Sequence, residues 1–314
     1  MVDSHLQRSR TASRVKLPFG LQGDRLIHVS EAEAGLACGC ICPACKERLV
    51  ARKGAKVIHH FAHLGRLICA HAFETGLHLA AKRILETHKK MRIPSVKLEF
   101  TSYKKPWTIH EECDIRFEHV SVESKLANVV PDVLIYAEGR PLAIEIAVTH
   151  FVDSLKLKRL SDLGLSTLEI DLAEFSRNPT LEGLEDEVVV SVRSKRWLYN
   201  AKVEAVKRKI PQFVERKALI GRGLALHVDG CPINARIWKG KSYANVIDDC
   251  VHCEYCFDAG PSMGPGFLSC LGGSHISRYQ DFLAAQRIKT GATSASNNRT
   301  SVLGVANNTL HPRA

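Results

Sequence analysis

One carboxylate inside an apolar strand pattern constrains this chain more than any other feature. Residues 131–150 read PDVLIYAEGRPLAIEIAVTH, an apolar run, a turn and a second apolar run. Asp132 opens the first run, residues 138–141 supply turn chemistry, and Glu145 stands in the middle of the second run. A carboxylate in a buried strand is costly unless it is paired or holds a cation. The pattern therefore predicts a hairpin whose two acids need a positive partner.

An aspartate and a glutamate on neighbouring strands can share one divalent ion. Carboxylate oxygens suit Mg²⁺ or Mn²⁺, which activate water for the hydrolysis of phosphate esters. Asp132 and Glu145 are accordingly the first candidates for a catalytic metal site. This arrangement favours a hydrolase that acts on phosphodiesters.

The composition limits the class of protein. With 314 residues and 45% apolar content, the chain can bury one substantial core together with small modules. No apolar run is long enough to span a bilayer and the first residues are polar and basic, so we expect a cytoplasmic protein without a membrane partner. The net charge of +11 favours a polyanionic partner, although such an excess can also simply solubilise a surface.

The cysteines gather in two places. In a chain without an export signal, CxxC spacing indicates zinc more than disulfides. Cys42 and Cys45 bracket a turn that lets two thiolates converge on one tetrahedral ion. His60, His63 and Cys69 are candidates for the remaining ligands, and strand alternation places the two histidines on opposite faces.

The second group of cysteines predicts a second zinc site. It offers five thiols for four positions, and spacing does not decide which is left out. The candidates are Cys231, Cys250, Cys253, Cys256 and Cys270.

Polar residues recur every four positions in a predicted helix over residues 74–85. Glu74, His78 and Lys82 form the polar stripe, opposite an apolar side. Such a stripe is often only a solvated face. A second amphipathic helix follows residue 148, with Leu155, Leu160 and Leu163 turned inward, and a short strand follows over 165–172.

This order of elements predicts an α/β fold with a mixed sheet flanked by helices. The segment over 185–222 is expected to be largely helical and carries a strong basic excess between Arg193 and Arg222, which suits either a phosphate backbone or a solvated face. The predicted divisions are a flexible basic leader (1–25), a zinc-ribbon-like module (26–72), a catalytic core (73–180), a basic helical segment (181–222), a cysteine-rich zinc module (223–289) and a disordered tail (290–314).

These motifs resemble the competence protein CoiA-like nucleases, whose fold is that of the PD-(D/E)xK restriction endonucleases. The resemblance covers roughly residues 38–175. It is carried by Cys42 and Cys45, the sequence HFAH, Glu74, His78, Lys82, Asp132, Glu145 and the stretches VTHFVDSLK and LEIDL. It implies a restriction-endonuclease-like core, divalent-metal binding by Asp132 and Glu145 together with Glu74, and partners that include DNA and DNA-processing or uptake proteins.

The chain departs from the superfamily pattern at Ala147. There the pattern has lysine, and CoiA-like members often carry glutamine. Alanine can neither orient water nor stabilise a leaving oxyanion. The resemblance suggests that a migrated lysine can fill this role, with Lys156 the first candidate and Lys82 the second, while His78 and Lys82 line the approach.

Two further readings stay open. In one, the acids are a degenerate nuclease core in a non-catalytic DNA-binding or processing protein. In the other, the cysteine modules are docking surfaces of a protein adaptor, which does not explain the Asp132 and Glu145 hairpin.

Overall fold

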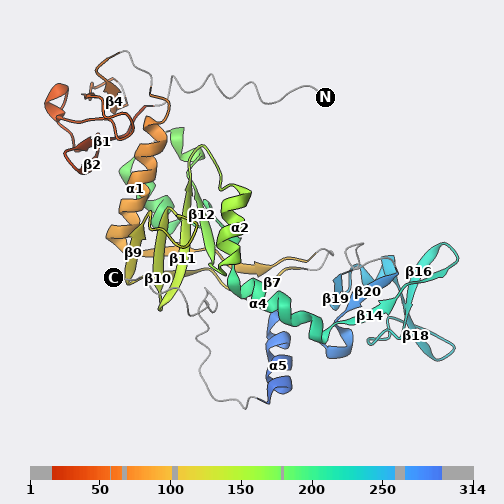
Figure 1. Ribbon diagram of the computed structural model, residues 1–314. Coiled ribbons are helices and arrows are strands. Elements are labelled where there is room, and N and C mark those ends of the chain that lie inside the picture. The colour runs from red at the N-terminus through yellow and green to blue at the C-terminus, as the bar shows by residue number, and fades with distance from the viewer. Residues whose placement is uncertain are drawn as a thin grey trace. The chain divides into compact units, whose positions relative to one another are not determined.

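The chain forms two compact units in the computed structural model, which describes residues 16–56, 58–65, 69–100, 105–177, 180–258 and 266–291 (Figure 1). Among the described residues, the first unit contains those within 16–94 and 113–199, and the second contains those within 95–112 and 200–291. The predicted catalytic core, 73–180, therefore differs from the observed division. It includes strands of the second unit and omits the last strand of the main sheet.

A five-stranded mixed sheet is the centre of the first unit. Its spatial order is β13-β12-β11-β10-β9, with β11 and β12 parallel and the other neighbours antiparallel. The strands are β9 (His119–Val122), β10 (Val133–Ala137), β11 (Arg140–Ala147), β12 (Thr167–Asp171) and β13 (Lys195–Tyr199). The chain is thus a mixed α/β protein, and its assignment to the restriction-endonuclease-like class stays a prediction.

The hairpin predicted around Glu138 and Gly139 is present between β10 and β11. Both turn residues have positive φ, 52° and 69°, which matches a two-residue turn of the type that suits the twist of a hairpin. β11 is buried along almost its whole length, as its apolar run predicts. The turn fixes the register, which pairs Val133 with Ile144 and so brings Asp132 opposite Glu145.

Two helices flank this sheet (Figure 1). α1 (Ala72–His88) is longer than the predicted helix and buries Leu77, Ala81 and Leu85. α2 (Ser154–Asp162) joins the parallel strands β11 and β12, and Asp153 caps its first turn by accepting from the Lys156 N–H. Leu160 is buried, whereas Leu155, predicted to point inward, is 56% exposed, because this nine-residue helix buries only a narrow face.

The amino-terminal part of the first unit is built from two small hairpins. They pair β1 (Phe19–Gln22) with β2 (Arg25–His28), and β3 (Leu49–Arg52) with β4 (His60–His63). Residues 16–25 were predicted to belong to a flexible leader, but β1 is ordered because Phe19 is buried beside His28. Residues 1–15 lie outside the described residues. β5 (Lys90–Ile93) and β8 (Cys113–Arg116) form a further ribbon in this unit.

The second unit contains a helical part and two small sheets. One sheet has the order β14-β20-β19 and the other β15-β16-β18-β17, and β6 pairs with β7. The elements are β6 (Val96–Leu98), β7 (Trp107–His110), α4 (Ala201–Lys209), β14 (Glu215–Ala218), β15 (Ile220–Arg222), β16 (Ala225–Asp229), β17 (Arg236–Trp238), β18 (Lys241–Asn245), β19 (Cys256–Asp258), β20 (Phe267–Cys270) and α5 (Tyr279–Thr290). Most of the predicted disordered tail, residues 292–314, lies outside the described residues.

The segment over 185–222, which was predicted to be largely helical, is helical only in part. It contains α4, a π-helical stretch at Asp186–Val190 that continues the short α3 (Leu181–Glu185), and a 3₁₀ turn at Ile210–Phe213, whereas β13, β14 and β15 are strands. β13 forms because its backbone completes the edge of the main sheet beside β12, with the Trp197 indole donating to the Pro94 carbonyl at 3.1 Å. Tertiary pairing overrides the helical preference of its lysines and arginines. Among the described residues, we find no helix long and apolar enough to cross a membrane.

Candidate metal centres

The first candidate centre is the cysteine–histidine group, formed by Cys42, Cys45, His63 and Cys69. Their ligand atoms all lie within 4.8 Å of one another, and the Cys45 Sγ and His63 Nε2 atoms are 3.3 Å apart. Cys42 and Cys45 sit on a tight turn in which the Lys46 N–H donates to the Cys42 carbonyl. β4 carries His63 to the same place. Three thiols and one imidazole form a donor set that could hold a structural metal ion such as zinc.

Burial and backbone hydrogen bonds set the character of two of these thiols. Burial raises the pKa of Cys42 to about 11. At Cys45 burial also acts to raise the pKa, but the Glu47 N–H and the thiols of Cys42 and Cys69 outweigh it and lower the pKa below its usual value. Cys45 is therefore the thiol of this pair that is readier to act as a thiolate ligand.

The structure separates the two candidate histidines of β4. His63 belongs to the cysteine–histidine group, whereas His60 lies outside it and its Nδ1 is 2.8 Å from the Ile58 carbonyl oxygen. Positions three apart on a strand face opposite sides, so one of the two cannot reach the thiols. Cys38 and Cys40 are buried in the core, where their thiols donate to the Leu49 and Cys38 carbonyls.

The second candidate centre lies on the main sheet, where Asp132 and Glu145 face each other across β10 and β11. Glu145 is 2% exposed, and its Oε1 has no hydrogen-bond partner among the described residues. Burial raises the pKa of Glu145 to about 7, and the negative charge of Asp132 adds to this effect. Asp132 Oδ2 accepts from the Ile146 N–H at 2.9 Å. Two close carboxylates, one of them buried, form an environment that a cation would stabilise.

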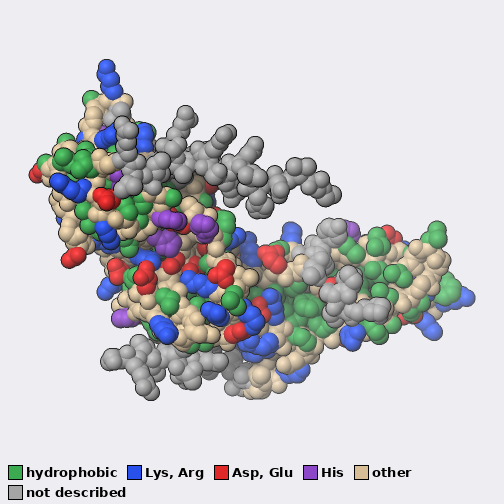
Figure 2. All heavy atoms as spheres, turned by 45° about the horizontal axis from the view of Figure 1, so that its top comes forward, with side chains coloured by type: hydrophobic (Ala, Val, Ile, Leu, Met, Phe, Trp, Pro, Cys, Tyr) green, Lys and Arg blue, Asp and Glu red, His purple; other side chains and the backbone are tan. Residues whose placement is uncertain are grey.

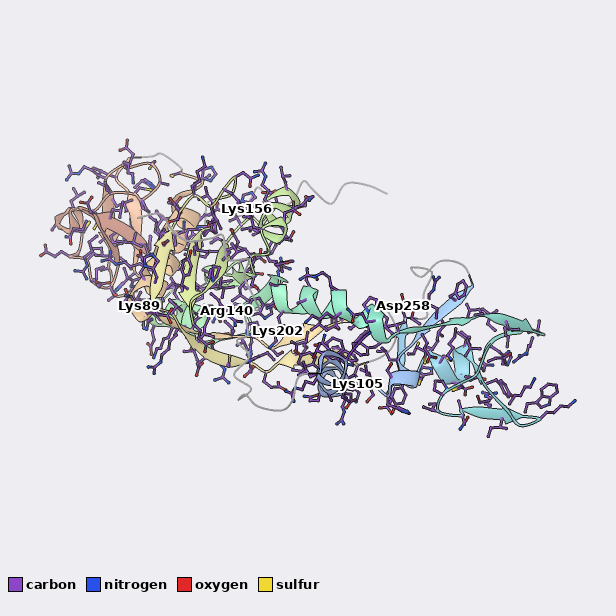
Figure 3. All side chains as sticks on the ribbon, turned by 60° about the horizontal axis from the view of Figure 1, so that its bottom comes forward. Lys89, Lys105, Arg140, Lys156, Lys202 and Asp258 are labelled. Atoms are coloured by element: carbon purple, nitrogen blue, oxygen red, sulfur yellow. The ribbon has the colours of Figure 1, made fainter. Side chains whose placement is uncertain are left out.

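Lys156 contacts Glu145 from α2, on which Figure 3 labels it. Its Nζ donates to Glu145 Oε2 at 2.6 Å, and its side chain is 24% exposed. The ammonium and its hydrogen bond lower the pKa of Glu145 and partly oppose the effects of burial and Asp132. Lys156 was selected from the sequence as the residue to replace the lysine missing at Ala147. The structure brings its ammonium to the Glu145 carboxylate, while Ala147 itself is buried.

α1 supplies two groups behind Asp132. His78 Nε2 contacts the Ile146 carbonyl and lies 3.8 Å from Asp132 Oδ2. Lys82 Nζ lies 3.8 Å from Asp132 Oδ1 and donates to Glu123 at 2.7 Å. These contacts hold the aspartate in place. Lys82 therefore forms ion pairs with both Asp132 and Glu123, and these pairs fix the position of its side chain.

Glu74 belongs to a neighbouring set of contacts. Its Oε1 lies 3.4 Å from His150 Nδ1, which in turn lies 2.8 Å from Thr149 Oγ1. Burial acts to raise the pKa of Glu74, but hydrogen bonds with Thr149 and His150 outweigh it and lower the pKa. Among the described residues, Asp132, Glu145 and Glu74 do not form a group with all ligand oxygens within 4.8 Å. Figure 2 shows histidine side chains gathered beside acidic ones on the face that it views.

A third carboxylate, Glu169, extends the pair and was missed in the sequence. It lies on β12 in register with Glu145, so both side chains leave the sheet on the same face. It is fully buried, and its two oxygens accept from Arg196 Nε at 2.6 Å and from the Val152 N–H at 3.3 Å. Asp132, Glu145 and Glu169 form what we call the carboxylate row. Glu169 stands in the middle of the apolar stretch LEIDL, just as Glu145 stands in the middle of its own apolar strand. The sequence pattern could therefore have revealed Glu169.

The five cysteines predicted to bind a second zinc ion also come together. Cys231, Cys250, Cys253, Cys256 and Cys270 line one cavity, and we call them the second cysteine cluster. Within the described part of the chain, the ligand atoms of the cysteine–histidine group all lie within 4.8 Å of one another. No three of the five thiols in the second cysteine cluster are that close together.

Comparison with known proteins identifies one part of the chain. Residues 31–72 match the family model described as the competence protein CoiA, N-terminal domain. This range contains all four members of the cysteine–histidine group. Neither the curated proteins nor the solved structures include a significant match to the chain.

Proposed function

Residues 31–72 are CoiA-like, and from this premise we propose that the protein is a competence-related, metal-dependent nuclease that hydrolyses phosphodiester bonds in DNA. The observation that carries the proposal is the hydrogen bond from Lys156 Nζ to Glu145 Oε2, 2.6 Å long, beside Asp132. Two acids and a lysine in contact are the set of groups that phosphodiester hydrolysis with a divalent ion needs.

The residues present suit a hard cation. Glu145 Oε1 is buried and has no hydrogen-bond partner among the described residues, and the Asp132 carboxylate opposes it across the hairpin. Both donors are oxygens, which Mg²⁺ and Mn²⁺ prefer. Bound between Asp132 and Glu145, such an ion would lower the pKa of its water and offset charge on the scissile phosphate.

The chain's own groups have distinct roles in this proposal. The Ile146 N–H and His78 hold Asp132 in position. A cation held by Asp132 and Glu145 would compete with Lys156 for the Glu145 carboxylate. The ammonium of Lys156 would then be free to orient the attacking water or to neutralise the phosphate. Glu74 and His150, which contact each other next to the site, would line the approach to it.

DNA is the proposed substrate because the chain carries a net charge of +11, which favours a polyanion. The restriction-endonuclease-like assignment of the sheet is part of the same proposal. It is supported by the mixed order of strands, with β11 and β12 parallel and the acids on β11 and at the start of β10.

A second candidate function is a non-catalytic DNA-binding accessory protein. It is favoured by Ala147, which is buried where the superfamily pattern places its lysine. In that case the chain binds DNA in a salt-dependent manner that survives Glu145→Ala, and it shows no turnover with any divalent ion.

Nicking of supercoiled plasmid by the purified full chain tests the proposal. We expect nicking that requires Mg²⁺ or Mn²⁺, is blocked by chelation, and is lost in Asp132→Ala and Glu145→Ala. Glu182→Ala is the matched control, since Glu182 is an exposed acid on α3. Circular dichroism confirms that each variant is folded. Equal cleavage by wild type and both variants overturns the proposal, and salt-dependent binding without cleavage supports the accessory protein.

A further inference from the structure

The second cysteine cluster surrounds a small cavity in the second unit. The cavity measures about 30 Å³, and Lys217 lines it together with the five thiols. A water molecule needs only about 10–15 Å³ of such space, so one ion fits. Three of the five cysteines also contribute to a small core in which Val228, Ala244 and Leu268 are the main apolar side chains. A core this small leaves the segment short of apolar contacts.

Tight turns present several of these thiols to the cavity. The Cys253 N–H donates to the Cys250 carbonyl at 3.0 Å, and the Cys256 N–H donates to the Cys253 carbonyl at 3.1 Å. At Cys231 the chain turns again, with the Asn234 N–H donating to the Cys231 carbonyl and Asn234 at a φ of 52°. Turns of this kind let nearby thiolates converge on one ion.

Two thiols of the cluster accept backbone hydrogen bonds of the kind seen in the cysteine–histidine group. The Tyr255 N–H donates to Cys253 Sγ at 3.4 Å, and the Gly272 N–H donates to Cys270 Sγ at 3.3 Å. Each donor lies two residues after its cysteine, as Glu47 does after Cys45. N–H donors aimed at sulfur stabilise a thiolate, which is the form that binds metal.

Burial and hydrogen bonding favour four of the five thiols as ligands. All four other thiols act electrostatically on Cys250, Cys256 most strongly, so Cys250 lies near each of them. Cys256 is the most deeply buried of the five, at 2% exposed, and packs in the small core from β19, opposite Cys270. Cys253 and Cys270 are partly exposed and accept the backbone hydrogen bonds described above.

We propose that Cys231, Cys250, Cys253 and Cys270 bind one structural Zn²⁺ ion, with Cys256 as a buried thiol that is not a ligand. The ion would join the turns at 231–234 and 250–253 to the end of β20, and so link the two small sheets of this unit. Because these thiols do not all lie within 4.8 Å, they must move closer on binding to reach Zn–S distances of about 2.3 Å. Lys217 Nζ, at the wall of the cavity, partly offsets the charge of four thiolates.

Zinc content of the full chain, purified under reducing conditions, tests this inference. We expect two zinc ions per chain for wild type, one for Cys253→Ser and one for Cys42→Ser. Cys256→Ser and Cys113→Ser should keep two, the latter as a control outside both groups. Cobalt substitution distinguishes the sites, since the second should give the absorption of a four-sulfur ligand set and the first that of three sulfurs and one nitrogen.

Alkylation of the wild-type protein tests the same inference even if a variant fails to fold. Its bound zinc should protect the four thiols from alkylation, and chelation should expose them together, as mapped by peptide mass spectrometry. One zinc per chain in wild type, all of it lost in Cys42→Ser, overturns the inference. So do disulfides within the second cysteine cluster, or loss of one zinc in Cys256→Ser.

Discussion

The cysteine–histidine group and the carboxylate row are both candidate metal centres, but they are assembled in opposite ways. The first lies within 28 residues, from Cys42 to Cys69, and takes its ligands from one turn, one strand and one following loop. The second brings together residues at the start of β10, on β11 and on β12 with a lysine from α2, and its Glu145 and Glu169 are buried. A metal ion would stabilise the fold at the first centre. At the second centre the fold holds the acids in place without an ion, and burying their charge lowers its stability.

This difference shows what each centre needs from the rest of the molecule. The cysteine–histidine group lies in a small module whose apolar core includes Phe19, Leu49 and Phe61, and a bound ion would add to the stability that this core supplies. The carboxylate row is held by the sheet and by neighbouring groups such as His78, Arg196 and the Ile146 N–H. We therefore expect loss of metal to destabilise the first centre and to leave the second folded but inactive.

Loss of zinc from the cysteine–histidine group should have the largest effect. His63→Ala removes one ligand, and structural zinc sites contribute about 10–16 kcal/mol of binding free energy in small zinc domains. We expect residues 26–72 to lose hydrogen-exchange protection while the main sheet keeps it. His60→Ala is the matched control, because His60 lies on the same strand but outside the group. Equal zinc content in the two variants would contradict the assignment of ligands.

Lys156→Ala should have the next largest effect, on the rate and not on the fold. Loss of a positively charged group at the scissile phosphate is expected to lower kcat by about 10²–10³-fold. The same change should tighten Mg²⁺ binding, because Lys156 competes with the cation for Glu145. Lys158→Ala is the control, since Lys158 lies on the same helix and pairs with Asp162 at 2.7 Å. Nicking rates and metal titrations check both effects. Weaker Mg²⁺ binding in Lys156→Ala would show that the lysine supports the metal site.

The same contrast explains what the sequence could predict. CxxC spacing indicated Cys42 and Cys45, and His63 and Cys69 were among the candidates for the remaining ligands, because all of these residues are close in the chain. The alternation of β4 indicated that His60 and His63 face opposite sides but did not decide between them. The hairpin and Glu145 followed from the turn at Glu138 and Gly139. β13 did not, because it becomes a strand only by pairing with β12, and no local pattern reports that pairing. Glu169 was missed although it stands in the middle of an apolar run, as Glu145 does, because its importance becomes clear only from the parallel register with Glu145.

Glu145 should make the stability of the metal-free protein depend on pH. Its pKa is raised from 4.5 to about 7 in the folded state, so the folded protein holds a proton that the unfolded chain has released. This contribution is complete below pH 4.5, falls by about 1.4 kcal/mol per pH unit as the pH rises, and is gone above pH 7. Glu145→Gln should lack this slope and be more stable than wild type at pH 8 in a chelator.

Urea unfolding of both proteins across pH 4.5–8 checks this expectation. Mg²⁺ at pH 8 should stabilise wild type and leave Glu145→Gln unchanged, because only the carboxylate binds the ion. Parallel pH profiles for the two proteins would mean that Glu145 is ionised throughout, and that Lys156 alone compensates its burial.

Glu169→Gln should have the smallest effect. It should distinguish Glu169, which positions a helix, from the two acids proposed to bind metal. Glutamine keeps an acceptor for the Val152 N–H but loses the charge that pairs with Arg196, at an expected cost of about 1–3 kcal/mol in the free energy of unfolding. Val152 leads directly into the Asp153 cap of α2, so Glu169 positions the helix that carries Lys156. We expect kcat to fall by roughly tenfold with KM unchanged. Glu174→Gln, an exposed acid after β12, should change neither quantity. A loss of activity as complete as that of Glu145→Ala would instead make Glu169 a metal ligand, and would extend the proposed ion site along the whole carboxylate row.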